Sequence, residues 1–536
     1  MADDVIVGLD AGTSVIKAVA FDLAGYQVAK AVCDNELHYT GDGGVEQDPG
    51  RTWTAAAETL RTLAAEVPGL VERVSAVAIT GQGDGTWLLD AEGQPVGRSM
   101  LWLDARSSDI VSRWRNSSVG PTTYASTGTG LNQSAQSGQL KWLSEHQPQR
   151  LARAATICHC KDWLYHCLTG ERATDPAEAV WTFGSYQRRD YDDAVLEAFG
   201  LSAYRRLLPP IVDGTREYAA LHRRAAAETG LKAGTPVVLA PVDMLATGLG
   251  AGVYDPHRRV ACSIVGSTGA HLYVRHRESD IVLHDQASYT MPFVAPGTWL
   301  QLASNMAATL NIDWFVDGLN ALFEAVGQPA VDRTQLLGRV DAALARVPPG
   351  RLIYHPFICT NGERGPFVNP QARAQFLGLD ADTTQLDMAR AIYEGIAFAA
   401  RDCYAALDAA PEEVRITGGG AQSATLAGIL ASVLGVPVRP LVREEAGAAG
   451  AAMVATLALG HYSRLEDVCA QWVTPHLAAC VSPDPALQQV YERLFPVYRD
   501  AYAHSDEFWR AFHAAGNPST PRTAFADVRD PATETK

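Results

Sequence analysis

Short apolar runs separated by turn-forming residues dominate the start of the chain. Residues 5–9 form an apolar, β-rich run, and two further runs follow at 14–21 and 26–32. The segment Asp22-Leu23-Ala24-Gly25 between the last two carries residues that favour tight turns. The pattern therefore predicts a strand, a glycine-containing turn and an antiparallel hairpin.

The pattern then changes to alternating helix and strand. From Asp48 onward, apolar residues recur at spacings of three and four behind Pro49, which predicts a helix with proline at an early position. Residues 74–80 have the composition of a buried strand, and they lead into the loop Gly81-Gln82-Gly83-Asp84-Gly85.

The same order of strand, turn and strand recurs in the second half. An apolar run at 236–240 ends in Pro241-Val242-Asp243, and runs at 260–265 and 271–274 enclose Gly266-Ser267-Thr268-Gly269. Repetition at half the chain length predicts a duplicated fold with a cleft between the halves.

This repetition divides the chain into an N-terminal domain, residues 1–246, and a C-terminal domain, residues 247–515. Later segments of the second domain are more helical, and the apolar spacing predicts helices at 384–407 and 424–434. Large apolar residues almost disappear after residue 515, so we predict a disordered tail at 516–536.

Charge and cysteine content narrow the class of protein. The 536-residue chain has 44 Lys and Arg against 60 Asp and Glu, a formal net charge of −16. This balance argues against a protein that mainly grips nucleic acid or an anionic membrane, although a nest of backbone N–H groups can still hold phosphate. Nine scattered cysteines suit reduced thiols, and no run reaches the ~18 apolar residues of a membrane span. We therefore expect a soluble cytoplasmic protein with neither nucleic-acid nor membrane partners.

The first glycine turn has the residue types of a phosphate site. Gly12 lets backbone N–H groups approach an oxygen-rich ligand, and the hydroxyls of Thr13 and Ser14 can donate to phosphate. Asp10 can hold Mg²⁺ through water, and Lys17 follows on the next strand. An ordinary hairpin turn is the alternative for this segment.

The second glycine turn, formed by Gly266, Ser267, Thr268 and Gly269, has the same composition. Two such turns in equivalent places of two half-chains predict a cleft that clamps a nucleoside triphosphate from both sides.

Further motifs occur in a fixed order over roughly residues 5–455. They are Gly8-Leu9-Asp10-Ala11-Gly12-Thr13-Ser14, Glu46-Gln47-Asp48-Pro49, Gly81-Gln82-x-x-Gly85, Trp102-x-Asp104-x-Arg106, Lys161-Asp162-Trp163-Leu164, Leu168-Thr169-Gly170, Gly362-Glu363-Arg364-x-Pro366, Glu394-Gly395-Ile396-Ala397 and Gly418-Gly419-Gly420-Ala421-Gln422-Ser423. With this series the chain resembles the FGGY carbohydrate kinase family, within the superfamily of actin, hexokinase and the heat-shock ATPases.

The resemblance implies an α/β fold of two actin-like, ribonuclease H-like domains around a central cleft. It also implies transfer of the γ-phosphoryl group of ATP to a hydroxyl of a sugar or polyol. The implied cofactor-binding residues are Asp10, Gly12, Thr13, Ser14, Lys17, Gly266, Ser267, Thr268, Gly269, Gly418, Gly419, Gly420, Ala421 and Gln422. Among them, the segment 418–421 is implied to lie at the start of a helix, whose N-terminus favours anions.

Asp243 occupies the place of the family's catalytic base, and with Asp10 it is the implied ligand of Mg²⁺. A carboxylate within hydrogen-bond reach of an alcohol can align it and accept its proton as the P–O bond forms. The alternative is that Asp243 only caps the helix expected to begin at Met244.

The implied substrate residues are Gln82, Asp84, Trp102, Asp104 and Asp243. Gly83 and Asp84 replace the residues with which glycerol and xylulose kinases of the family hold their substrates. The loop instead resembles that of members acting on erythritol, so we expect a short linear polyol, erythritol first, with a pentulose or glycerol as alternatives. Asp84 as a solvated turn residue and Trp102 as plain core are the alternatives for these two side chains.

Two other classes of protein stay open as rivals. One is a non-catalytic, ATP-responsive member of the superfamily, and the other is an ATPase of the heat-shock type that lacks a sugar pocket. A homodimer is a possible partner state. We expect Cys158-His159-Cys160 to lie on a strand with both thiols on one face, without the further ligands of a metal site.

Overall fold

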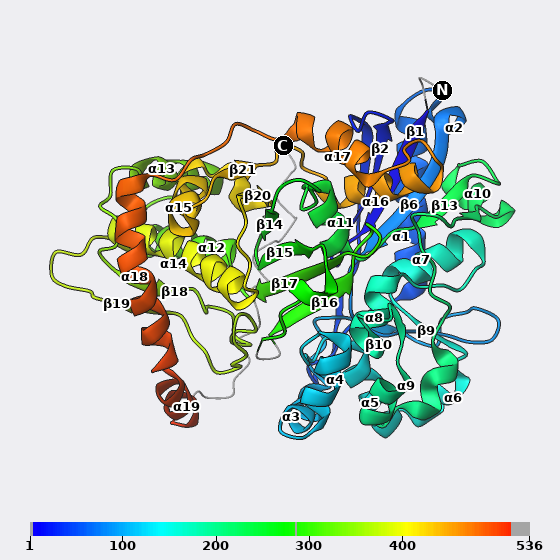
Figure 1. Cartoon of the computed structure of the whole chain (residues 1–536), viewed down its shortest axis with the longest axis horizontal. Helices are drawn as coiled ribbons and strands as arrows, with labels where there is room; N and C mark the ends of the chain where they lie inside the picture. Colours follow the sequence, from blue (N-terminus) through cyan, green and yellow to red (C-terminus); the bar gives the residue numbers. More distant parts are fainter. Residues whose placement is uncertain (1–3, 285–286, 516–536) are drawn as a thin grey trace.

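The computed structural model describes residues 4–284 and 287–515, so the predicted tail at 516–536 lies outside the described residues. Each half of the chain contributes a six-stranded sheet. Figure 1 shows the two sheets side by side, with helices between them and on their outer faces.

The N-terminal sheet has the strand order β12-β13-β6-β1-β2-β3. Its strands are β1 (Val5–Ala11), β2 (Val15–Asp22), β3 (Gln27–Asp34), β6 (Val74–Gly81), β12 (Ala219–Ala220) and β13 (Pro236–Leu239). Strands β1, β2 and β3 form the predicted antiparallel hairpins, and β6 and β13 extend the sheet in parallel with β1.

Helices cover the outer face of this sheet. They include α1 (Pro49–Glu66), α7 (Cys160–Thr169) and α10 (Arg223–Thr229). The predicted start of α1 is confirmed: Asp48 is the N-cap, and its Oδ1 accepts the N–H groups of Gly50 at 2.8 Å and Arg51 at 3.2 Å.

The C-terminal sheet has the order β16-β17-β15-β14-β20-β21. Its strands are β14 (Val260–Val265), β15 (Gly269–Arg275), β16 (Ser288–Pro292), β17 (Trp299–Asn305), β20 (Glu413–Thr417) and β21 (Val438–Pro440). Strands β17, β15, β14, β20 and β21 repeat the order and directions of β3, β2, β1, β6 and β13. The predicted duplication is therefore present in the fold.

The outer face of the C-terminal sheet lies under a larger group of helices. They are α12 (Thr309–Ala325), α13 (Arg333–Leu344), α14 (Gln385–Ala406), α15 (Ala424–Leu434) and α18 (Pro485–Ala503), at the left of Figure 1. Both helices predicted in this region, α14 and α15, are present within a residue of their expected ends.

Two further helices fill the space between the sheets. They are α11 (Asp243–Gly250) and α16 (Ala446–Ala458), which pack against each other, and α16 also lies on β1 and β6. The contact is close because it is made by glycines: a Cβ on Gly450 would lie 1.8 Å from the carbonyl oxygen of Ala246. Because one buried core joins both sheets through these helices, the division at 246/247 stays a prediction.

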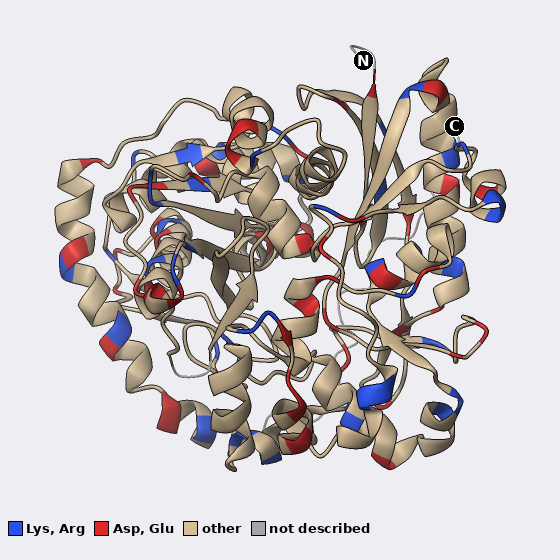
Figure 2. Cartoon of the chain, turned by 45° about the vertical axis from the view of Figure 1, so that its right-hand side comes forward, with Lys and Arg blue, Asp and Glu red and all other residues tan. Residues whose placement is uncertain are grey.

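The surface carries mixed charge. Figure 2 shows Lys and Arg interspersed with Asp and Glu on the outer helices, despite the net charge of −16. Within residues 4–284 and 287–515, no helix combines the length and the apolar character needed to cross a bilayer.

Candidate active site

Three carboxylates lie where neighbouring parallel strands of the N-terminal sheet end. Asp10 is near the end of β1, Asp84 follows β6, and Asp243 follows β13. Because β1, β6 and β13 are parallel neighbours, their carboxyl ends share one edge of the sheet. The structure therefore brings together three residues that are far apart in the sequence.

Burial shifts the pKa of each of these groups. It raises the pKa of Asp10 to about 6, with the positive charge of Lys17 opposing it. Burial also raises the pKa of Asp84 to about 6 and that of Asp243 well above its usual range. The negative charges of Asp10 and Asp84 add to the rise in the pKa of Asp243, so ionised Asp10 and Asp84 each disfavour ionisation of Asp243.

Asp243 is the first residue of α11, and Val242 is the N-cap. The helix was expected to begin at Met244, so it starts one residue earlier, with Asp243 in its first turn. The Asp243 Oδ1 accepts the N–H of Met244 at 2.7 Å, while Oδ2 makes no hydrogen bond with the described residues. The contact with the helix start and an oxygen left for a ligand therefore coexist.

Asp84 has an unusual backbone for a residue with a side chain. Asp84 lies between Gly83 and Gly85, and its φ of +55° is in the left-handed region. This conformation costs a non-glycine residue roughly 1–2 kcal/mol. Its carboxylate has no hydrogen-bond or ion-pair partner among the described residues, and the positive charges of His159 and Arg364 lie near enough to oppose the rise in its pKa. A strained residue with an unused carboxylate favours a ligand-binding role over that of a solvated turn.

A hydrogen-bond network fixes the first glycine turn to the loop after β6. The Thr13 hydroxyl donates to Gln82 Oε1 at 3.1 Å and accepts the Trp102 indole N–H at 2.8 Å. The Gln82 Nε2 donates to Gln47 Oε1 at 2.7 Å, and Gln47 Nε2 donates to the Thr13 carbonyl at 2.7 Å. The polar atoms of Gln82 and Trp102 thus position Thr13, and only the ring of Trp102 is left to form a pocket wall.

Asp104 and Lys17 both have protein partners that the sequence did not predict in full. The Asp104 carboxylate pairs with Arg106 at 2.6 Å and also accepts the Val45 N–H at 3.0 Å. It is fully buried, so the structure favours a supporting role for it rather than substrate contact. Lys17 Nζ pairs with Glu445 Oε2 at 2.9 Å, across the two halves of the chain.

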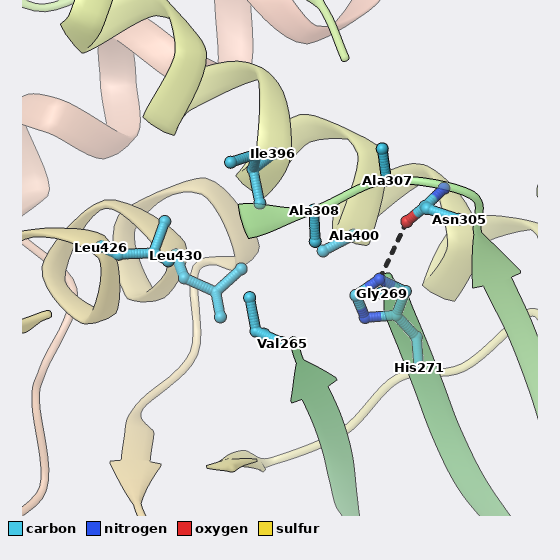
Figure 3. A pocket seen from close by; sticks show the side chains of 10 residues that line it. All are labelled: Val265, Gly269, His271, Asn305, Ala307, Ala308, Ile396, Ala400, Leu426 and Leu430. Atoms are coloured by element: carbon cyan, nitrogen blue, oxygen red, sulfur yellow. Dashed lines mark hydrogen bonds between the residues drawn. The ribbon is translucent and has the colours of Figure 1, made fainter. Parts of the chain in front are cut away.

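The second glycine turn joins β14 to β15 and leaves Ser267 and Thr268 exposed. The Gly266 carbonyl accepts the Thr309 N–H at 2.9 Å, which ties this turn to the start of α12. Figure 3 shows the small, mainly apolar cavity beneath the turn, where His271 Nε2 and Asn305 Oδ1 are 3.0 Å apart. The hydrogen bond from Thr309 therefore fixes the position of the turn.

The glycine segment 418–421 lies directly beside the second turn. A Cβ on Gly418, whose φ is +88°, would lie 2.8 Å from the carbonyl oxygen of Val265. The segment was expected at the start of a helix. It is instead a separate 3-10 turn, η3 (Gly419–Gln422), and α15 begins after its N-cap, Ser423.

The segment Cys158-His159-Cys160 does not lie on one strand as expected. Strand β9 (Thr156–Cys158) ends at the first cysteine, and α7 begins at the second. His159 is the N-cap of α7, and its backbone N–H donates to Asp162 Oδ2 at 3.0 Å. The expected arrangement of two thiols on one strand face is therefore wrong.

A buried charge cluster lies behind the carboxylates. His159, Asp162 and Glu178 place ligand-type atoms within 4.8 Å of one another. However, Lys161 Nζ lies 2.6 Å from Asp162 Oδ1, 2.7 Å from Asp175 Oδ2 and 2.7 Å from Glu178 Oε2. The lysine ammonium thus supplies the positive charge there, and the negative charge of Glu178 adds to the raised pKa of Asp243.

Several residues around the site carry roles that the sequence did not reveal. Gln47 and Arg364 lie within the motifs quoted above, and those motifs are the signal that could have singled them out. Trp181, in α8 (Pro176–Phe183), lies outside these motifs, and a Cβ on Gly83 would lie 3.0 Å from its ring. Glu445 had no signal of its own, because its partner Lys17 is 428 residues away.

Two sheets of repeated topology, each with a glycine turn after its first strand, define the actin-like class of two-domain α/β proteins. The N-terminal domain of the FGGY family of carbohydrate kinases matches residues 5–250, and the C-terminal domain of that family matches residues 261–459. The chain belongs to this family of carbohydrate kinases.

Sequence identity to individual members of the family differs. The chain is 46% identical over 500 residues to an erythritol kinase of Brucella abortus, covering 93% of this chain and 96% of the relative. It is 26% identical to an L-xylulose/3-keto-L-gulonate kinase of Escherichia coli, covering 95% and 98%. A solved xylulose kinase structure from Rhodospirillum rubrum superposes with a TM-score of 0.84 at 28% identity, covering 94% and 100%.

Proposed function

We propose that this protein transfers the γ-phosphoryl group of ATP to a hydroxyl of erythritol, giving ADP and an erythritol phosphate. The observation that carries the proposal is the 46% identity to an erythritol kinase over 93% of the chain. Identity to the L-xylulose/3-keto-L-gulonate kinase is only 26% over a similar length. The loop with Gly83 and Asp84, which differs from those of glycerol and xylulose kinases, supports the same substrate.

Asp243 is the proton acceptor in this proposal. Its raised pKa makes it a stronger base than an ordinary carboxylate, while one oxygen stays oriented by the Met244 N–H. The polyol hydroxyl donates to the other oxygen, so the proton passes to Asp243 as the oxygen bonds to phosphorus. Closure of the site keeps water from competing for the phosphoryl group.

The two glycine turns are the proposed phosphate contacts. Thr13, oriented by Gln82 and Trp102, donates from the N-terminal half, although its hydroxyl must then exchange its bond to Gln82 for one to phosphate. Thr268 and the backbone of the second turn donate from the C-terminal half. The segment 418–422, which packs against the second turn, is the proposed site of the α-phosphate, ribose and adenine.

The residues present fit Mg²⁺. Asp10 and Asp243 are partly buried carboxylates that raise one another's energy when both are charged, and a divalent cation would remove that repulsion. Mg²⁺ is usually held in such kinases by one or two carboxylates together with the nucleotide phosphates. When bound, it would neutralise negative charge on the transferring phosphoryl group.

We place the reaction in the cytoplasm, which the free thiols of all nine cysteines support. A homodimer stays a prediction.

A coupled ADP-release screen tests the substrate. Erythritol, threitol, glycerol, xylitol, xylulose and ribulose are compared at equal concentration with saturating MgATP. We expect the highest kcat/KM with erythritol. A preference for a pentulose or glycerol would correct the substrate within the family, whereas ADP release that no acceptor stimulates would favour the ATPase or the non-catalytic rival.

A further inference from the structure

We propose that Arg364 binds the polyol from the C-terminal half, opposite Asp84 in the N-terminal half, so that the substrate bridges the two. This inference rests on the proposed function and adds a substrate-binding residue to it. It assigns to the C-terminal half a part in acceptor recognition, in addition to nucleotide binding.

Asp84 and Arg364 have complementary charges and stay apart. Trp181 links the two segments: a Cβ on Gly83, the neighbour of Asp84, would lie 3.0 Å from its ring, and the ring of Tyr289 is centred 6.0 Å away. Tyr289 lies on β16, which pairs with β17, the strand that Arg364 contacts. The positive charge of Arg364 acts on both Asp84 and Tyr289, in agreement with this arrangement. No ion pair or hydrogen bond joins Arg364 to Asp84 in the part of the chain that the structure describes. Neither charge is used by the other, so both stay available to a hydroxylated molecule.

The guanidinium is held at one end and unused elsewhere. Arg364 Nη2 donates to Ser304 Oγ at 2.7 Å, at the end of β17. Its Nε is buried and has no hydrogen-bond partner in the described structure. An unpaired buried donor destabilises the free protein, so a ligand that accepts a hydrogen bond from it removes that cost on binding.

The loop that carries Arg364 is held on β17 by hydrogen bonds and close backbone packing. Glu363 Oε1 accepts the N–H groups of Met306 and Arg364, each at 2.8 Å. A Cβ on Gly365 would lie 2.7 Å from the Ser304 carbonyl oxygen, so the loop backbone lies directly on β17. The backbone that carries the guanidinium is therefore held in one position, as a residue that determines substrate specificity requires.

The same loop is tied to the second glycine turn through Asn305. Its Nδ2 donates to the Gly365 carbonyl at 2.6 Å, so its Oδ1 is left to accept from His271 Nε2 at 3.0 Å, the bond drawn in Figure 3. His271 lies two residues after Gly269, the last residue of that turn. One side chain thus fixes the proposed polyol-binding and phosphate-binding segments relative to each other.

A short polyol matches this pair chemically. Each of its hydroxyls can donate to a carboxylate and accept from a guanidinium N–H at the same time. Adjacent hydroxyls can therefore bind Asp84 and Arg364 from opposite sides. Because the two residues belong to different halves of the chain, the acceptor itself favours the arrangement in which both glycine turns face the nucleotide.

Kinetics of Arg364→Gln and Arg364→Lys test the proposal. We expect Arg364→Gln to raise the KM for erythritol about 10- to 100-fold, the range for loss of a charged hydrogen bond, with the KM for ATP changed less than about twofold. Arg364→Lys keeps the charge but not the Nε donor, and we expect an intermediate effect. Arg339→Gln, at an exposed position of α13, is the matched control and should match the parent enzyme.

A double variant tests whether Asp84 and Arg364 bind the same substrate, and a binding measurement tests whether each variant is folded. If the two residues hold one substrate, Asp84→Asn with Arg364→Gln should raise the KM by less than the product of the single effects. A thermal shift with MgATP, retained in each variant, shows that the protein is folded. An unchanged polyol KM in Arg364→Gln, or an equal rise in both KM values, would overturn the inference.

Failure of the proposed function has a different signature. If the parent enzyme prefers another acceptor, erythritol is wrong, and the same Arg364 comparison is made with the preferred acceptor. A normal KM for that acceptor in Arg364→Gln would then overturn the inference separately. If no acceptor stimulates ADP release, both proposals fail.

Discussion

Individual side chains at the site combine a structural contact with an unused chemical group. Asp243 gives one oxygen to the Met244 N–H and keeps the other free, and Arg364 gives one nitrogen to Ser304 and keeps its Nε unpaired. Asp84 holds its carboxylate on a left-handed backbone without any described partner. The atom that is hydrogen-bonded to the protein orients the side chains of Asp243 and Arg364, and the unpaired atom of each stays available to a substrate.

Replacing Asp243 tests the proton acceptor. Asp243→Asn keeps the size of the side chain and an oxygen for the Met244 N–H but loses the base, so we expect kcat to fall about 10²- to 10⁴-fold. Affinity for MgATP, measured by calorimetry, should stay nearly unchanged. Asp467→Asn, an exposed residue in α17 (Leu465–Trp472), is the control. Comparable kcat values for Asp243→Asn and the parent would remove Asp243 from the chemistry.

The pH dependence of stability tests the buried carboxylates. The pKa of Asp84 is about 6 in the folded protein against an ordinary value of 3.8, so the folded state binds its proton more tightly than the unfolded state. The contribution of Asp84 to the free energy of unfolding is therefore fully present below pH 4. It is lost as the pH rises through 6, where the carboxyl group ionises in the folded protein.

Asp84→Asn replaces the carboxyl group with a neutral amide, so the variant does not lose stability as the pH rises. We expect the variant to be more stable than the parent by roughly 1–3 kcal/mol at pH 8, with the difference disappearing toward pH 4. Urea denaturation at several pH values, without ligands, measures it. A variant that is less stable than the parent at pH 8 would mean that the carboxylate makes a favourable contact inside the protein.

Local sequence patterns predicted the positions of some of these residues but not the contacts of others. Asp10 and Asp243 stand at the ends of apolar runs, so their place at strand ends followed from the chain itself, and Asp84 followed from its loop. The pair of Lys17 and Glu445 could not be predicted, because 428 residues separate its members and no periodic pattern links them. Asp104 was expected near the substrate, but the pattern could not reveal that the Val45 N–H occupies its carboxylate.

Helices and strands position the site through unusually close backbone contacts. Helices α11 and α16 can lie between the sheets only because glycines face the partner backbone. A Cβ on Gly8 of β1 would lie 2.1 Å from the Ala448 carbonyl oxygen of α16. The strands and several long helices were predictable from apolar runs and spacing, whereas the ends of short elements, such as α11 and η3, depend on tertiary contacts.

An alanine at Gly450 tests this packing. Its methyl group would overlap the Ala246 backbone, which cannot move like a flexible side chain, so we expect a loss of about 3 kcal/mol or more in the free energy of unfolding. Gly428→Ala in α15 is the matched control, since nothing lies within 4 Å of its Cβ position. There the better helix propensity of alanine should add up to about 1 kcal/mol. Equal stability of the two variants would show that α16 can shift.

The two halves together form one molecule that cannot be divided simply at the predicted boundary. Helix α16 comes from the C-terminal half of the chain, yet it covers β1 and β6 of the N-terminal sheet. The duplication was visible in the sequence because apolar runs and glycine turns repeat. The position of α16 on the N-terminal sheet was not visible, because it depends on contacts between segments more than 360 residues apart.

A fragment tests how far the halves depend on each other. Residues 1–246 lack α16, so the fragment would expose the face of the N-terminal sheet that this helix buries. We expect the fragment to unfold without a cooperative transition and to bind a hydrophobic dye, unlike the full chain. Cooperative thermal unfolding of the fragment would instead support an independent N-terminal domain.

The most direct test of the proposed function follows the phosphoryl group itself. Phosphorus NMR of the purified protein with MgATP and erythritol measures ADP, inorganic phosphate and phosphomonoester in one sample. We predict one erythritol phosphate for each ADP, with little inorganic phosphate, and loss of both products in Asp243→Asn. Inorganic phosphate as the main product, or no phosphomonoester from erythritol, would contradict an erythritol kinase activity.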